Sequence, residues 1–131
     1  MTYCLGIVAA WLDASGIAHE ISNARVGLSF VDHGVLARLP GDFRLSIQTH
    51  PTVVGEAFAE TALCHKHRIV DALAYQHRGV IRWHTPHELF AHVRELVELL
   101  DGHTADDDAV TLKDGRRVTL SRVPLKADWN V

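Results

Sequence analysis

The sequence contains few cysteines, few aromatic residues and no excess of positive charge, and each shortage excludes a class of protein. Only Cys4 and Cys64 are present in 131 residues, which excludes a small fold held together by several disulfides. Aromatic residues make up 7% of the chain, and its net charge is −3 with neutral histidines. Both values argue against nucleic-acid binding, which relies on basic surfaces and stacking platforms.

Several segments with recognisable chemistry are also missing. The chain has no glycine-rich phosphate-binding loop, no serine nucleophile elbow and no apolar run long enough to cross a bilayer. The mildly apolar segment from Met1 to Trp11 lacks the basic start and the cleavage site of a secretion signal. We therefore expect a cytoplasmic protein with two reduced thiols and no membrane association, and no residue can be assigned a catalytic role.

Histidine, in contrast, is abundant. Ten histidines occur in the chain, and seven of them lie between His50 and His92. Imidazole is the side chain that titrates nearest neutral pH and is the commonest metal ligand in proteins. Because protonating all ten would change the net charge from −3 to +7, we expect a surface whose sign changes in mildly acidic solution.

The first half of the chain predicts one helix and a three-stranded meander. Residues 3–15 carry apolar side chains at helical spacing, and Gly16 is suited to end a helix. Residues 25–30, 35–39 and 43–48 alternate with period two, with turns expected at Asp32-His33-Gly34 and Pro40-Gly41-Asp42. We expect such a meander to bury one face and expose the other.

The second half predicts further strands around a second helix. Residues 57–64 fit a strand or a short helix, of which we favour the strand, and residues 80–83 form another strand. Thr85-Pro86 then begins a helix over residues 86–101, and Asp114-Gly115 predicts a hairpin between residues 110–113 and 117–120. The predicted fold is α+β in a single domain, residues 1–131. It has an antiparallel sheet of about five strands, two helices packed on one face and a C-terminal β-hairpin.

His65 and His67 form the pair of histidines best suited to shared chemistry. On a strand, residues two apart project to the same face, so both imidazoles could reach one divalent metal ion. A third ligand would have to come from elsewhere, and the candidates are His50, Glu60, His77 and especially His84. The alternative interpretation is a solvated polar turn between two strands.

The predicted helix over residues 86–101 carries two further histidines, and His84 lies just before it. Imidazoles near a helix N-terminus tend to stay neutral, which suits metal binding or general-base catalysis. We expect His87 and His92 to lie on the polar side of this helix, opposite Phe90 and Val93. That placement favours a solvent-exposed surface over an active site.

The middle of the chain resembles small uncharacterised proteins encoded by actinobacterial phages. The resemblance rests on residues 45–51, on residues 57–62 and on Arg82-Trp83 before the helix, and it covers roughly residues 43–100. It implies an accessory or host-interaction protein in the infected cell, and it transfers no catalytic residue to this chain.

Together these observations favour a small non-enzymatic binding or regulatory protein that acts through a protein partner or as a homo-oligomer. One alternative is a metal-binding protein or metal-dependent enzyme that uses His65 and His67. Another is a small-ligand binder with a pocket between sheet and helices. No cofactor is expected apart from a divalent metal.

Overall fold

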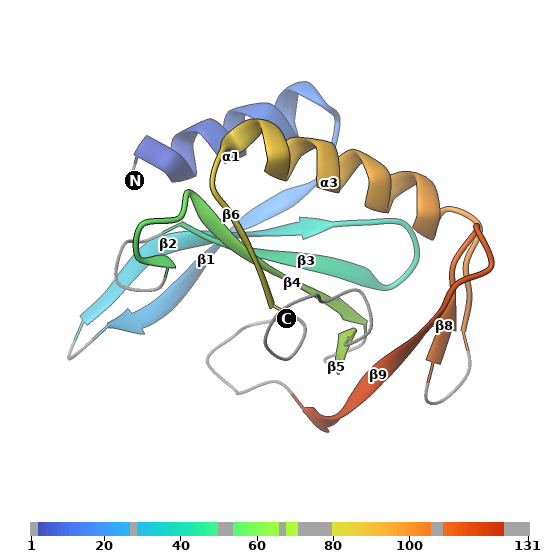
Figure 1. The fold of residues 1–131 in the computed structure, drawn as a ribbon. Helices are drawn as coiled ribbons and strands as arrows, with labels where there is room; N and C mark the ends of the chain where they lie inside the picture. Colours follow the sequence, from blue (N-terminus) through green and yellow to red (C-terminus); the bar gives the residue numbers. More distant parts are fainter. Residues whose placement is uncertain are drawn as a thin grey trace.

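The computed structural model describes residues 3–26, 29–49, 54–65, 68–70, 80–105 and 109–124. Helices α1 (Tyr3–Ala14) and α3 (Pro86–Leu100) lie across one face of an antiparallel sheet (Figure 1). The sheet strands are β1 (His19–Val26), β2 (Ser29–Arg38), β3 (Phe43–Gln48), β4 (Ala59–His65), β5 (Arg68–Val70), β6 (Val80–Trp83), β7 (Thr104–Ala105), β8 (Ala109–Thr111) and β9 (Arg117–Pro124).

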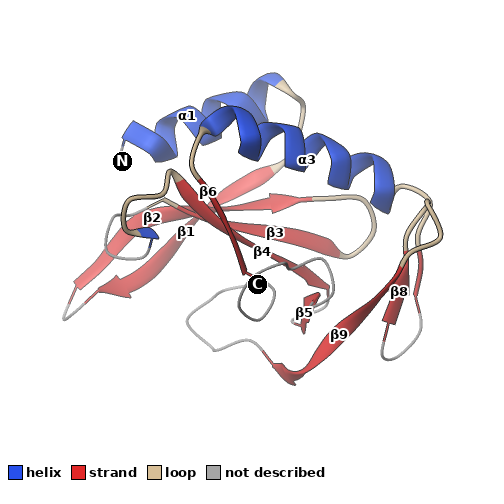
Figure 2. Cartoon of the chain, viewed as in Figure 1, coloured by secondary structure: helices blue, strands red, loops and turns tan. Residues whose placement is uncertain are grey.

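Strands β1 to β5 follow one another in space as they do in sequence, so they form a five-stranded meander. The far edge of β4 is shared between two partners: β6 pairs with residues 59–62, and β5 pairs with Cys64 and His65. Strand β9 continues the sheet beside β5 and pairs antiparallel with β8 on its other side. The α+β class, the meander and the two helices predicted from the sequence are confirmed (Figure 2).

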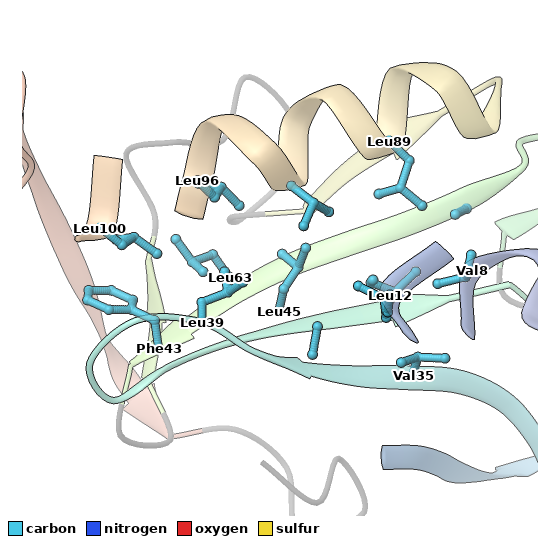
Figure 3. Close-up of a cluster of buried hydrophobic side chains, with 14 of the residues drawn as sticks. Val8, Leu12, Val35, Leu39, Phe43, Leu45, Leu63, Leu89, Leu96 and Leu100 are labelled. Carbon is cyan, nitrogen blue, oxygen red and sulfur yellow. The ribbon is translucent and has the colours of Figure 1, made fainter. Parts of the chain in front are cut away.

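The core lies between the two helices and the sheet face that they cover. Since alternate residues of a strand share one face, Val35 and Ala37 of β2 and the odd-numbered positions of β3 and β4 lie on the face toward the helices. The buried side chains labelled in Figure 3 come from all of these elements: Val8, Leu12, Val35, Leu39, Phe43, Leu45, Leu63, Leu89, Leu96 and Leu100.

The opposite face of the meander is not the wet surface expected from its alternating pattern. Leu36, Ser46 and Ala62 pair side by side across three strands on that face, and each is at most 4% exposed. Cys64, two residues along β4, is 2% exposed. The expectation of one exposed face is therefore wrong for Leu36, Ser46 and Ala62, because these side chains are buried although they lie on the face away from the helices.

The turn expected at Asp32-His33-Gly34 is also wrong, because β2 runs through these residues without interruption. The pairing with β1 steps from Ser22↔Gly34 to Asn23↔Asp32, which leaves His33 as a bulge. Gly34 does not adopt a left-handed backbone; instead, a Cβ atom there would lie 2.9 Å from the backbone oxygen of Ile47. The glycine permits close packing between strands, which sequence pattern alone does not distinguish from a turn.

Helix α3 begins as its sequence predicts. The Thr85 side chain accepts a hydrogen bond from the Glu88 backbone N–H at 3.2 Å, and Pro86 occupies the first helical position. Leu89, Val93, Leu96 and Leu100 follow at helical spacing and are buried. Within the described ranges, neither helix is long and apolar enough to cross a membrane.

Candidate functional site

The histidine with the best geometric case for function lies at the end of β4. His65 is the last residue of that strand and is 6% exposed, on the same face as the core residue Leu63. Its register partner on β3 is Phe43, and the two ring centres are 4.6 Å apart. An imidazole is thus held against a buried aromatic ring, at the edge of the hydrophobic core.

A second histidine reaches the same place from the C-terminal end of α3. The centre of the His103 ring lies 5.0 Å from that of Phe43, edge to face, and 6.4 Å from that of His65. We call these three side chains the His65–Phe43–His103 cluster. It joins β4, β3 and the segment after α3, which are far apart in the sequence.

Local structure positions each member of the cluster. Gly41, in the turn between β2 and β3, has a φ of +74°, and the turn is closed by the Leu39 N–H donating to the Phe43 oxygen at 3.0 Å. A Cβ atom at Gly41 would lie 2.6 Å from Cε1 of His103. A side chain at this position would therefore strain the left-handed backbone and displace the imidazole from the space that it occupies.

The hydrogen bond made by His103 indicates which of its nitrogens is available. Its Nδ1 lies 2.7 Å from the carbonyl oxygen of Leu100, in the last turn of α3. A carbonyl can only accept, so Nδ1 carries the hydrogen in this contact and Nε2 of the neutral ring retains its lone pair. The ring can thereby bind a metal ion through Nε2.

The structure does not bring His84 to His65. His84 follows β6, whose Trp83 pairs with Ala59 at the opposite end of β4. His65 is six residues along β4 from Ala59, which corresponds to about 20 Å at about 3.3 Å per residue. His84 therefore lies too far from His65 to complete a shared site.

The other proposed ligands are not gathered around His65 either. Glu60 lies on the opposite face of β4 from His65 and accepts a hydrogen bond from Nε of Arg82 at 3.1 Å. His50, His67 and His77 lie outside the described residues. The His65–His67 metal pair thus stays a prediction, and among the described residues no group of three or more histidine, cysteine or acidic side chains could hold a metal ion.

Of the two histidines expected on the polar side of α3, one lies there and the other does not. His87 is exposed, but His92 is half-buried, with its ring centre 4.6 Å from that of Trp83. Burial lowers the pKa of His92 to about 4. The prediction that His92 lies on a polar surface is wrong, because β6 packs beneath that side of α3 and supplies an aromatic surface.

Cys64 is unsuited to nucleophilic chemistry. Burial raises the pKa of its thiol to about 12, so the thiolate form is scarce at neutral pH. As expected from strand alternation, it lies on the other face of β4 from His65.

Sequence reasoning missed His103. It stands alone after a glycine, 38 positions from His65, and no spacing rule links the two. The one local signal is the glycine of the turn Pro40-Gly41-Asp42, because Gly41 leaves the space that the His103 ring occupies.

Comparisons with known proteins add no assignment: no family model, no curated protein and no solved structure matches the chain.

Proposed function

We propose that this is a non-enzymatic binding protein whose interaction surface is the outer edge of β1, and that its partner there is a second copy of the chain. In the described part of the molecule, no strand pairs with that edge of β1. An edge strand presents a row of unpaired N–H and C=O groups to any strand that can align with it. This open edge is the observation that carries the proposal.

Two of the residues that most strongly block edge pairing are absent from β1. The strand is eight residues long and contains neither proline nor lysine, the residues most often used to protect an edge. Ile21 is 38% exposed and is the one large hydrophobic side chain found exposed where the structure describes side chains. At the other end of the strand order, β7 has two residues and offers far less backbone.

A second copy is compatible with the charge pattern of β1. In an antiparallel pair related by a two-fold axis, one residue must face its own copy. An axis at Ser22 places Glu20 opposite Ala24, and an axis at Asn23 places Arg25 opposite Ile21. Neither arrangement sets like charges against each other, which would oppose association.

Sedimentation velocity over a range of protein concentrations tests the proposal. We expect a reversible dimer for the natural chain and a monomer for Ile21→Lys, because a lysine at an edge blocks strand addition. Ala91→Lys, which adds the same charge on the exposed side of α3, is the matched control and should remain dimeric. A natural chain that stays monomeric at every concentration, or an Ile21→Lys chain that dimerises as before, would contradict the proposal.

A dimer of this kind is compatible with a regulatory role. The resemblance of the middle of the chain to actinobacteriophage proteins supports an accessory protein that acts in the infected cell. In that setting, the same edge of β1 would be available to a strand from another polypeptide whenever the chain is monomeric.

A further inference from the structure

We propose that the His65–Phe43–His103 cluster binds a divalent transition-metal ion, with His65 and His103 as its two protein ligands and water in the remaining positions. The ion belongs to the class that prefers imidazole nitrogen, such as Cu²⁺, Ni²⁺ or Zn²⁺. In this site, His103 takes the place of His84 as the histidine that completes the metal site with His65. It does not depend on pairing through β1.

The separation of the two rings falls within reach of one ion. An imidazole nitrogen lies about 2.0–2.1 Å from bound zinc. The centres of two ligating rings are therefore about 5 Å apart when the nitrogens bind at a tetrahedral angle. They are about 6.4 Å apart when the nitrogens bind on opposite sides of the ion. The observed distance between the centres of His65 and His103 is 6.4 Å. The ring planes are inclined by 72°, so a shared ion also requires that a nitrogen of each ring point toward it. A tetrahedral site further needs the ring centres to approach by about 1 Å.

The surroundings of His103 are those of a metal ligand. Metal-binding histidines usually donate the hydrogen of their other nitrogen to a carbonyl or carboxylate, which fixes the tautomer and orients the ring. The contact of 2.7 Å from Nδ1 of His103 to the Leu100 carbonyl is of this kind. It also places the ring at the C-terminal end of the 15-residue helix α3, where the helix dipole favours a cation.

The other side chains of the cluster hold the site in shape and leave a path to it. Phe43 is 1% exposed and contacts both imidazoles, so neither ring can turn away without disturbing the core. His103 itself is half-buried, which lets an ion arrive from solvent through that side. Gly41 lies against Cε1 of His103, so a side chain at position 41 would displace the ring.

Titration of the full, untagged chain with Cu²⁺ alone tests the proposal by calorimetry and electron paramagnetic resonance. We expect one Cu²⁺ ion to bind tightly to each chain, with a paramagnetic resonance spectrum that shows coupling to two imidazole nitrogens. His103→Gln should weaken this binding at least about tenfold, since even the loss of a group that only orients a ligand typically costs that much. Since His103 is half-buried at the end of a helix, this variant should fold, and thermal unfolding without metal checks that it does.

Three further variants test the ligand set. His87→Gln, at an exposed position on α3, is the matched control and should bind Cu²⁺ as the natural chain does. Gly41→Ala should weaken binding through the displaced ring, although it removes no ligand. If His67→Gln abolishes binding while His103→Gln leaves it unchanged, or if uptake is spread over several weak sites insensitive to His103→Gln, the proposal is overturned.

Discussion

The imidazole of His92 lies against the indole of Trp83, with ring centres 4.6 Å apart and planes inclined by 34°. Trp83 is fixed in turn, because its Nε1 donates a hydrogen bond to Oγ1 of Thr61 at 2.9 Å. This contact joins α3 to β6 and β4. It depends on a neutral histidine, since burial lowers the pKa of His92 to about 4.

We predict that the protein loses stability in mild acid through His92. Its folded pKa lies below the ordinary value of 6.5, so the unfolded chain binds a proton first as the pH falls. The free energy of unfolding should therefore decrease between about pH 6.5 and pH 4, by up to about 3 kcal/mol from this residue. Urea unfolding across this range, compared between the natural chain and His92→Phe, measures the effect.

His92→Phe keeps an aromatic ring against Trp83 but cannot bind a proton, so its stability should vary less with pH than that of the natural chain. His87→Gln, at an exposed position, should leave the pH dependence as it is. Equal slopes for the natural chain and His92→Phe would show that His92 does not control this transition.

We predict that Gly34 does not tolerate a side chain. A Cβ atom at this position would lie 2.9 Å from the backbone oxygen of Ile47, which cannot move aside without disturbing β3. Gly34→Asn should cost about 1–3 kcal/mol of stability, as overpacking does. Gly16→Asn is the control: Gly16 has a φ of +71° with nothing within 4 Å of its Cβ position, and asparagine tolerates such a backbone. Similar losses for both variants in denaturant unfolding would argue against close packing at Gly34.

We predict that the two thiols differ sharply in reactivity. Cys4 is half-buried, whereas Cys64 is buried and its pKa is raised to about 12. Alkylation with iodoacetamide at pH 8, followed by mass spectrometry, should label Cys64 at least about a hundredfold more slowly in the folded protein than in urea. Cys64→Ser should leave the fast reaction intact, and Cys4→Ser should remove it. Rapid labelling of Cys64 in the folded chain would exclude the buried position.

We predict that the cap of α3 contributes measurably to stability. Removing the Thr85 hydroxyl leaves the Glu88 N–H without the acceptor that it contacts at 3.2 Å, so Thr85→Ala should cost about 1 kcal/mol. Thr85→Ser keeps the hydroxyl and should cost much less. Urea unfolding of both variants checks this, and an unchanged midpoint for Thr85→Ala would mean that the hydrogen bond adds nothing.

Much of the fold follows from local patterns in the sequence. Helix α3 is marked by Thr85-Pro86 and by leucine and valine at helical spacing, and β3 by the alternation of Phe43, Leu45 and Ile47. Both patterns arise because a single element must turn its apolar side chains to one side. The candidate site could be predicted only in part, since His65 is marked by its strand but His103 is not marked by any neighbour.

The errors share a physical cause. The sequence pattern predicts a turn at Gly34, an exposed position for His92 and a site shared by His84 and His65. Each depends on a neighbour from a different element: the Ile47 oxygen on β3, the Trp83 ring on β6, and the pairing of Trp83 with Ala59.

By itself, the amino-acid sequence determined helices α1 and α3, strand β3 and the apolar side chains that they bury, because these are properties of short stretches of chain. Only the tertiary structure decided that His103 lies 6.4 Å from His65 while His84 lies at the other end of β4. The reason is that the distance between two histidines depends on strand register and helix placement, and both are set by the packing of the whole core.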